Sequence, residues 1–279
     1  MTHCIAIHSY KGGTGKTTIA ANAAALLAMM GKRVAILDLD VYAPSLHNYF
    51  KINPKKWIND FLDNNADINE AIIDLTDTHF PQLKERSHSN GRLFTGFSNP
   101  SRDAIFKFEM GNGTDYWKKQ FRKLVFLREQ IITKLDTDFI IIDTSPGIRH
   151  WSINALSIAD KLILTMKMDD LDIEGTKKLL FEIYTTFVRF GAISYILLNR
   201  VSGYCIPCTN IDSDMEKNQD HRIVLEELHK ETGANSLTPL PCYCDIQFSP
   251  REFLTVINNP NHPFSLKLKK IISEMTYNQ

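Results

Sequence analysis

The chain has 279 residues, of which 43% are hydrophobic and 23% charged, so it can bury a substantial core and lacks the composition of a disordered protein. Its 32 Lys and Arg residues balance its 32 Asp and Glu residues, which excludes a net charge that would favour nucleic acid or anionic membrane. No signal peptide and no apolar run of the roughly 20 residues that a membrane span needs is evident, so we expect a soluble cytoplasmic protein.

Predicted strands and helices alternate along the chain. The apolar residues 3–9 predict a strand, and the Ala- and Leu-rich residues 17–30, which end at a glycine, predict a helix. Later elements are strands at 33–40, 138–145, 161–168 and 192–200, weaker strands at 93–98 and 236–241, and a helix at 173–190.

This alternation predicts a doubly wound α/β fold, with a mostly parallel sheet and helices on both faces. Functional residues are expected at the carboxyl ends of its strands. We expect one domain over residues 1–279, in which residues 51–135 form an irregular insertion of helices and loops at the sheet edge.

The stretch HSYKGGTGKTT, residues 8–18, joins the first strand to the first helix. Its end matches the phosphate-binding loop pattern G-x-x-x-x-G-K-[ST], in the strand–loop–helix context that this motif requires. Lys16 is expected to reach the β- and γ-phosphates of ATP, and Thr17 to ligate Mg²⁺. Tyr10 replaces the first glycine of the pattern, and an additional lysine, Lys11, follows it. The predicted nucleotide-binding residues here are Lys11, Gly12, Gly13, Thr14, Gly15, Lys16, Thr17 and Thr18.

KGGTGKTT resembles the deviant phosphate loop, or deviant Walker A motif, of the ParA/MinD/Mrp group of P-loop ATPases. The resemblance implies that Lys11 reaches across a homodimer interface to the partner's ATP, where a cation offsets phosphate charge much as an arginine finger does. The alternative is that Lys11 is a solvated loop charge.

Three aspartates end predicted strands. LDLDVYAPS places Asp38 and Asp40 after the second strand, and IIIDTSPG places Asp143 after a later one. The resemblance implies that Asp40 orients the attacking water and that Asp38 and Asp143 lie near Mg²⁺, whereas each aspartate alone could be a strand-end cap. The expected catalytic residues are Lys11, Lys16 and Asp40.

The resemblance continues to residues 166–175, LLNR (197–200) and LPCYCD (240–245). It implies that Asn199 reads the edge of the adenine and that Pro241 packs beside it.

Two cysteine pairs follow predicted strands. Cys205 and Cys208 form a C-x-x-C motif, and Cys242 and Cys244 form a C-x-C motif. Four thiolates suffice for a tetrahedral zinc site, which we expect in preference to an iron–sulfur cluster. Mrp-type scaffold proteins carry a C-x-x-C after this strand that binds a cluster between subunits, and this resemblance keeps the iron–sulfur alternative open. A thioredoxin-like pair and four uncoordinated thiols are further alternatives.

Two segments bear on DNA or membrane contact. MinD-type proteins usually end in a membrane-seeking amphipathic helix, but the apolar face of residues 264–275 is expected to cover the sheet instead. The basic run at residues 117–128 could touch DNA phosphates, although a solvated helix face is the commoner explanation.

These features predict a slow, dimerisation-dependent Mg²⁺-ATPase that acts as a positioning or partitioning switch with an unidentified activating or cargo protein. An Mrp-like metal or iron–sulfur carrier and a nucleotide-binding module with negligible turnover are the alternatives.

Overall fold

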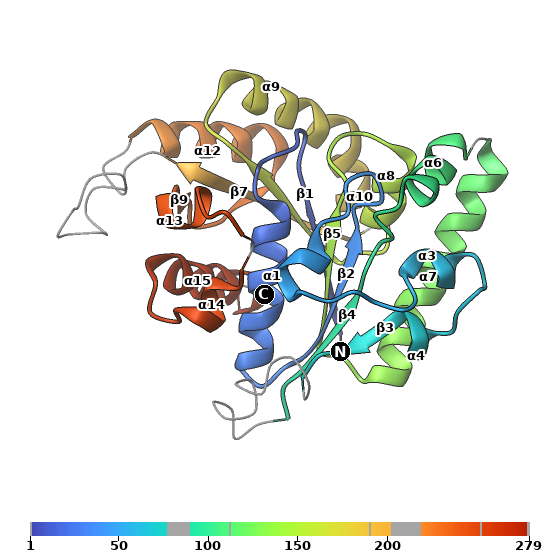
Figure 1. Ribbon diagram of the computed structural model, residues 1–279. Coiled ribbons are helices and arrows are strands. Elements are labelled where there is room, and N and C mark those ends of the chain that lie inside the picture. Colours follow the sequence, from blue (N-terminus) through green and yellow to red (C-terminus); the bar gives the residue numbers. More distant parts are fainter. Residues whose placement is uncertain are drawn as a thin grey trace.

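The computed structural model describes residues 2–76, 90–111, 113–189, 191–201, 219–251 and 253–277. Its centre is a sheet in the order β3-β4-β2-β5-β1-β6-β7-β8, and a further short strand, β9, pairs with β7 (Figure 1). The strands are β1 (His3–His8), β2 (Arg33–Leu39), β3 (Ile72–Asp74), β4 (Arg92–Gly96), β5 (Phe139–Thr144), β6 (Lys161–Met166), β7 (Ile193–Val201), β8 (Asn235–Ser236) and β9 (Leu240–Pro241).

Helices connect these strands and cover both faces of the sheet. They are α1 (Lys16–Met29), α2 (Leu46–Phe50), α3 (Ile58–Leu62), α4 (Ile68–Ala71), α6 (Arg102–Met110), α7 (Thr114–Leu135), α8 (His150–Leu156), α9 (Asp170–Leu179), the π-helix η1 (Leu180–Tyr184), α10 (Thr185–Arg189), α12 (Gln219–Thr232), α13 (Cys244–Gln247), α14 (Thr255–Asn258) and α15 (Pro263–Tyr277). The expected doubly wound α/β architecture is confirmed.

All described strand pairs are parallel except β3 with β4. Parallel pairing places the carboxyl ends of the central strands at one edge, and the register sets Asp38 of β2 beside Asp143 of β5. Two aspartates separated by about a hundred residues in sequence therefore become neighbours.

Alternate residues of each strand pack in two different cores, because successive side chains of a strand point to opposite faces of the sheet. Ile5 and Ile7 of β1 pack in the core beneath α1, α14 and α15, whereas Cys4 and Ala6 pack in the core beneath α7, α8 and α9. The central strands are apolar on both faces for this reason, which is typical of a covered parallel sheet.

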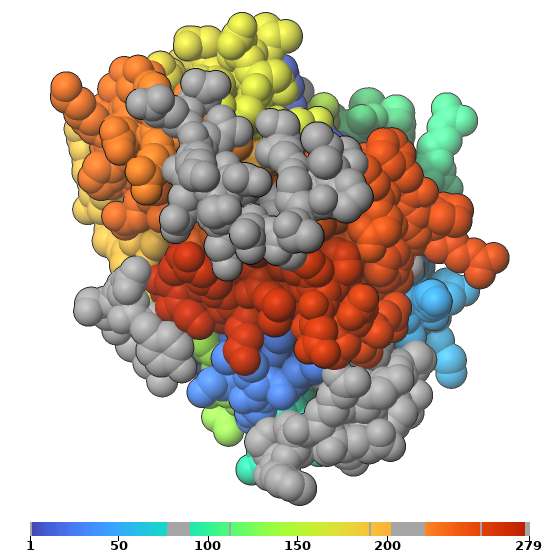
Figure 2. All heavy atoms as spheres, turned by 90° about the vertical axis from the view of Figure 1, so that its left-hand side faces the viewer, coloured from blue at the N-terminus to red at the C-terminus, as the bar shows by residue number. Residues whose placement is uncertain are grey.

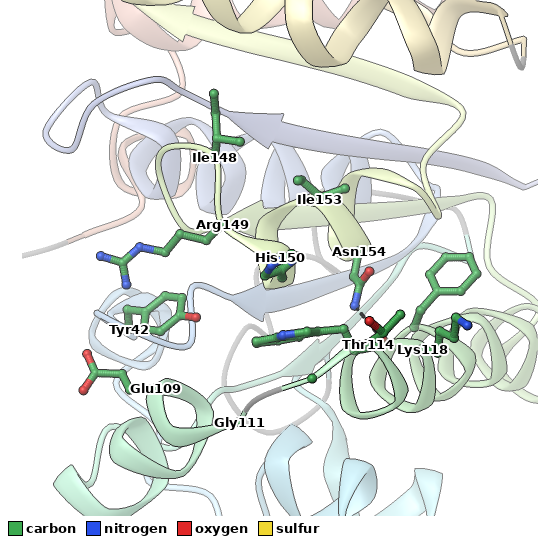
Figure 3. A pocket seen from close by; sticks show the side chains of 13 residues that line it. Tyr42, Glu109, Gly111, Thr114, Lys118, Ile148, Arg149, His150, Ile153 and Asn154 are labelled. Carbon is green, nitrogen blue, oxygen red and sulfur yellow. Dashed lines mark hydrogen bonds between the residues drawn. The ribbon is translucent and has the colours of Figure 1, made fainter.

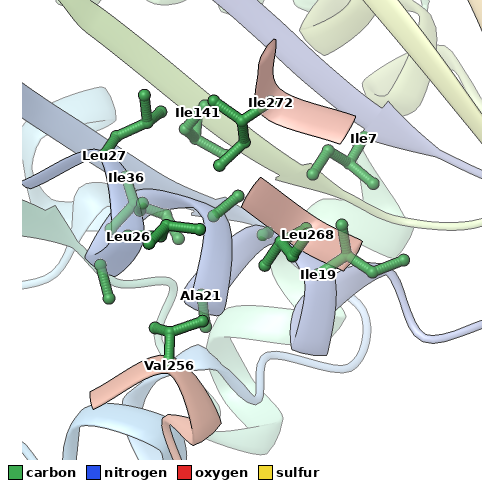
Figure 4. Close-up of a cluster of buried hydrophobic side chains, with 14 of the residues drawn as sticks. Ile7, Ile19, Ala21, Leu26, Leu27, Ile36, Ile141, Val256, Leu268 and Ile272 are labelled. Carbon is green, nitrogen blue, oxygen red and sulfur yellow. The ribbon is translucent and has the colours of Figure 1, made fainter. Parts of the chain in front are cut away.

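The C-terminal helix α15 belongs to the first core (Figure 4). Its apolar face is at most 4% exposed and consists of Phe264, Leu268, Ile271, Ile272 and Met275. Helices α14 and α15 both contact α1, and they lie on the face of the molecule that Figure 2 shows. The expectation of a core helix is therefore confirmed. In the part of the chain that the structure describes, no helix combines the length and apolarity needed to cross a membrane.

Three elements differ from the expectation. The insertion contributes β4, as expected, but also the antiparallel edge strand β3, whose three residues are too few to show a period in the sequence. The predicted strand at 236–241 is split into β8 and β9 around a short connection. The predicted helix at 173–190 begins earlier, at Asp170, and changes to π-helical hydrogen bonding at Leu180.

Candidate functional site

The phosphate loop joins β1 to α1 at the carboxyl edge of the sheet. Gly13 and Gly15 have φ angles of 74° and 90°, in the left-handed region that favours glycine. Gly15 precedes the first turn of α1, and no side chain among the described residues caps that turn. The N–H groups there are therefore available to an anion, which the helix dipole also favours.

Two residues at the end of β7 hold the loop from outside. The Asn199 Nδ2 donates a hydrogen bond to the Thr14 carbonyl at 2.7 Å, and the Arg200 Nη1 donates one to the Gly13 carbonyl at 2.8 Å. Arg200 has a φ of 60°, which is uncommon for a residue with a side chain. These bonds hold the carbonyl groups of Gly13 and Thr14 and so restrain the loop.

Lys16 is the buried cation of the site. Its ammonium group donates a hydrogen bond to the Ser9 hydroxyl at 3.0 Å. Burial lowers the pKa of Lys16, and the carboxylate of Asp143 acts in the opposite direction. A further anion, such as a phosphate, would favour the charged form of this lysine.

Asp143 is 1% exposed, and neither of its carboxylate oxygens has a hydrogen-bond partner of normal geometry within the described chain. Burial raises its pKa to about 7, against the opposing influence of Lys16 and of the nearby Thr17 hydroxyl. Two buried oxygens without donors, beside a hydroxyl group, fit a hard divalent cation such as Mg²⁺.

Asp38 is differently placed from Asp143, although the two are register neighbours. Its carboxylate accepts hydrogen bonds from the backbone N–H groups of Asp40 and Leu46, both at 3.1 Å. Burial, and then the charges of Asp143 and Asp40, raise the pKa of Asp38 well above its ordinary value. It therefore shapes the loop after β2, and its raised pKa favours the neutral carboxyl unless a cation binds nearby.

Asp40 connects the two loops of the site. One carboxylate oxygen accepts hydrogen bonds from the Ser145 hydroxyl at 2.8 Å and from the Ala43 N–H at 3.2 Å. Ser145 belongs to the turn that follows Asp143, so this hydrogen bond joins the loop after β2 to the loop after β5.

Lys11 is 39% exposed at its side chain and lies 3.5 Å from the carboxylate of Asp169. Tyr10, the residue in place of the motif's first glycine, packs against α9. A Cβ atom placed on Gly175 would lie 2.0 Å from the Tyr10 ring, so the absence of a side chain on α9 makes room for this tyrosine.

A small pocket of about 100 Å³ adjoins the start of α1. Gly15, Thr18, Asn199 and Pro241 are among its lining residues. The residues expected beside the adenine are thus brought together with the phosphate loop, although Asn199 already donates one hydrogen bond to that loop.

The two cysteine pairs differ in what the structure describes. Cys205 and Cys208 lie outside the described residues. Cys242 follows β9, and its N–H donates a hydrogen bond to the Val201 carbonyl at 3.0 Å, so the two pairs follow neighbouring strands as expected. Within the described residues, no group of three or more Cys, His, Asp or Glu side chains is placed to hold a metal ion.

Sequence reasoning assigned no role to several residues around the site. These are Ser9, Lys167, Asp169 and Arg200. Only position gave a signal for them, since each is one of the last two residues of a predicted strand or, for Asp169, directly follows one.

The glycine loop, the buried lysine and the strand-end carboxylates define a P-loop nucleotide-binding protein. Residues 5–236 match the family described as the CobQ/CobB/MinD/ParA nucleotide binding domain, and the chain belongs to this family.

Individual relatives match a smaller part of the chain than the family match does. The sporulation initiation inhibitor protein Soj of Bacillus subtilis is 28% identical over 182 residues, which cover 64% of each chain. A chloroplast Fe-S cluster assembly factor of Arabidopsis thaliana is 50% identical over 150 residues, which cover 53% of this chain and 23% of the relative. The chain thus spans less than two thirds of the curated relatives that it matches. The solved structure of the septum site-determining protein MinD of Pyrococcus horikoshii with Mg-ADP superposes with a TM-score of 0.70 at 21% identity, over 99% of this chain and 96% of that one.

Proposed function

We propose that this protein is a Mg²⁺-dependent ATPase that dimerises around ATP and acts as a nucleotide switch in positioning or partitioning. The observation that carries the proposal is the buried carboxylate of Asp143, for which the described residues supply no hydrogen bond of normal geometry and on whose pKa the Lys16 charge and the Thr17 hydroxyl act. A buried carboxylate without donors is costly unless a cation binds it.

Each residue has a defined task in this proposal. The backbone N–H groups of residues 12–17 and the Lys16 ammonium bind the phosphates. Thr17 and Asp143 would hold Mg²⁺, which when bound would neutralise phosphate charge. Asn199 and Pro241 contact the adenine.

Hydrolysis adds water across the bond between the β- and γ-phosphates and releases ADP and inorganic phosphate. In this proposal Asp40 accepts a hydrogen bond from that water, and the hydrogen bonds that its carboxylate accepts from the Ser145 hydroxyl and the Ala43 N–H orient it. Asp38 supports Asp40 through the backbone hydrogen bond to its N–H.

The test separates binding from turnover. Asp40→Ala should bind ATP with near wild-type affinity but hydrolyse it about 100-fold or more slowly, because an oriented general base acts mainly on the transition state. Lys16→Ala should lose ATP affinity itself. Binding is measured with a fluorescent ATP analogue, and hydrolysis by phosphate release. An Asp40→Ala variant with the wild-type rate would remove this carboxylate from the mechanism.

Cytoplasmic location, and an activating or cargo protein as partner, belong to the same proposal. A regulatory role with a partner is in keeping with relatives such as Soj, which is named as an inhibitor of sporulation initiation. Direct DNA or membrane contact is not supported by the net charge or by α15, whose apolar face is buried.

A second candidate function is the transfer of a metal or an iron–sulfur cluster. It is favoured by relatives named as an iron–sulfur cluster carrier and an Fe-S cluster assembly factor. It is also favoured by Cys242, whose N–H bonds to Val201 at the end of β7, four residues before the C-x-x-C motif begins at Cys205. The four-cysteine zinc site stays a prediction, because two of its ligands lie outside the described residues.

Metal content after anaerobic purification distinguishes these possibilities. Zinc at about one per chain, lost in Cys205→Ser and in Cys242→Ser, would favour the closed zinc site. Iron with a visible absorption band, lost in Cys205→Ser but kept in Cys242→Ser, would favour a cluster shared between two subunits. Cys4→Ala is the matched control, since Cys4 is fully buried in the core. Absence of both metals would reject this second function.

A further inference from the structure

A cavity of about 820 Å³ lies beside the phosphate loop site rather than within it (Figure 3). One wall is Tyr42, in the loop after β2. A second is Ile148, Arg149 and His150, where α8 begins. The third comes from α6 and α7 of the 51–135 insertion, whose contribution includes Trp117.

Two of these walls continue loops of the phosphate site. Tyr42 is two residues beyond Asp40, and Arg149 follows the turn that contains Ser145. The hydrogen bond from the Ser145 hydroxyl to Asp40 joins these loops at 2.8 Å. The shape of the cavity therefore depends on the loops that flank the attacking water in the proposed reaction.

The walls are aromatic and held in place by specific contacts. The Arg149 guanidinium lies 4.2 Å from the centre of the Tyr42 ring, and the rings of His150 and Trp117 stack at 5.3 Å. The Asn154 amide donates a hydrogen bond to the Trp117 carbonyl at 3.1 Å and so ties α8 to α7. The insertion and the nucleotide-site loops thus form one surface.

The charge of this surface is unequal. Arg149 and Lys118 are cations, Glu109 is the acid among the lining residues, and neither cation forms an ion pair with an acidic side chain that the structure describes. Ile148 is 42% exposed and adds an apolar rim. A complementary ligand carries carboxylates together with an apolar or aromatic group.

The cavity is open rather than enclosed. Arg149, His150, Lys118 and Glu109 are all exposed. Small-molecule sites usually bury most of their ligand, whereas an open hollow with aromatic walls and a charged rim suits a protein segment. We propose that this cavity binds an acidic peptide segment of a partner protein, with an apolar side chain against Trp117 and carboxylates at Arg149 and Lys118.

The experiment uses a phage-displayed library of random 12-residue peptides, selected on the full chain. Enriched sequences should be rich in Asp and Glu and contain an aromatic or large aliphatic residue. Synthetic copies should lose at least tenfold in affinity for Arg149→Glu and Lys118→Glu, and salt should weaken their binding. The matched control is Lys119→Glu, which makes the same charge change on the same helix at a residue that does not line the cavity.

Other outcomes overturn the proposal. These are enrichment of basic sequences, no enrichment, and affinity unchanged by both charge reversals. If Arg149→Glu does not fold, Arg149→Gln and Trp117→Ala replace it, with folding checked by circular dichroism.

Only the nucleotide dependence of this binding rests on the proposed function. ATP should change peptide affinity in the Asp40→Ala variant, where ATP persists, and a fluorescent ATP analogue reports nucleotide occupancy independently. Failure of the analogue to bind would count against the proposed function, whereas failure of peptide selection counts against the cavity alone.

Discussion

His8 has its side chain fully buried one residue before the phosphate loop begins. Its Nδ1 lies 2.8 Å from the Thr144 hydroxyl, which in turn donates a hydrogen bond to the Ile7 carbonyl. The ring also stacks on Tyr184 of the π-helix at 6.4 Å. A neutral imidazole is required here, because burial, and then the charge of Lys16, lower the pKa of His8 to about 3.

A pH dependence of stability follows from this residue. The pKa of His8 is about 3 when folded and 6.5 when unfolded, so between these values the unfolded chain binds an additional proton. The free energy of unfolding should therefore fall as the pH falls below 6.5, by up to about 1.4 kcal/mol per pH unit from this group. His8→Gln should lack this term.

Urea unfolding of both proteins with EDTA, from about pH 7 to pH 5, measures the effect. The stability difference between wild type and variant should shrink as the pH falls. Taking the difference removes the contributions of other groups, including Asp143, whose raised pKa acts in the opposite direction. A difference that is constant with pH would show that His8 is not held neutral.

At the scale of elements, the contact between the phosphate loop and α9 explains the departure from the usual motif. Glycine inside a helix costs up to about 1 kcal/mol relative to alanine, so Gly175 needs a compensating reason. That reason is the ring of Tyr10, which occupies the space a side chain would take. Tyr10 stands in place of the first glycine of the motif and packs against α9, where Gly175 leaves room for its ring.

Gly175→Ala tests this packing contact. Overpacking against the rigid ring typically costs about 1–3 kcal/mol, more than the gain in helix propensity, so the variant should be about 1 kcal/mol less stable than wild type. In a Tyr10→Ala background the ring is absent, and the same substitution should become stabilising. Chemical denaturation of all four proteins gives the coupling energy, and additive effects would mean that the two residues do not touch.

The sequence predicts which residues end the strands at the site better than it predicts the contacts between the loops of the site. Asp38, Asp40 and Asp143 end apolar runs, and parallel pairing brings such ends together whatever lies between them. The hydrogen bond of Ser145 to Asp40 and the packing of Tyr10 on Gly175 depend on loop conformations that no period encodes. The edge strand β3 was missed because three residues next to a helix carry no pattern.

At the scale of the whole molecule, Lys11 lies at the surface and pairs with Asp169 of the same chain. The pair with Asp169 is solvent-exposed on both sides, and such pairs contribute about 0–1 kcal/mol. A partner's phosphates would compete easily for this lysine. In the proposed ATP-bound dimer, Lys11 would therefore exchange its contact with Asp169 for one across the interface.

Sedimentation of the Asp40→Ala variant measures this step. ATP, but not ADP, should shift it from monomer towards dimer, and adding Lys11→Ala should weaken the shift at least tenfold. Asp169→Asn should leave the dimer as strong or stronger, because it only releases the lysine. A single mass with either nucleotide would reject the ATP-sandwich dimer.

The hydrogen bonds that Asn199 and Arg200 donate to the phosphate loop have a consequence for biosynthesis. Asn199 lies 185 residues after Thr14, to which it bonds, and Arg200 lies 187 residues after Gly13. A nascent polypeptide that has left the ribosome only through β5 already contains the loop, Lys16 and all three aspartates, but the outer side of its loop is still unsupported. Competence to retain nucleotide should consequently arise late in translation, when β7 emerges and docks beside β6.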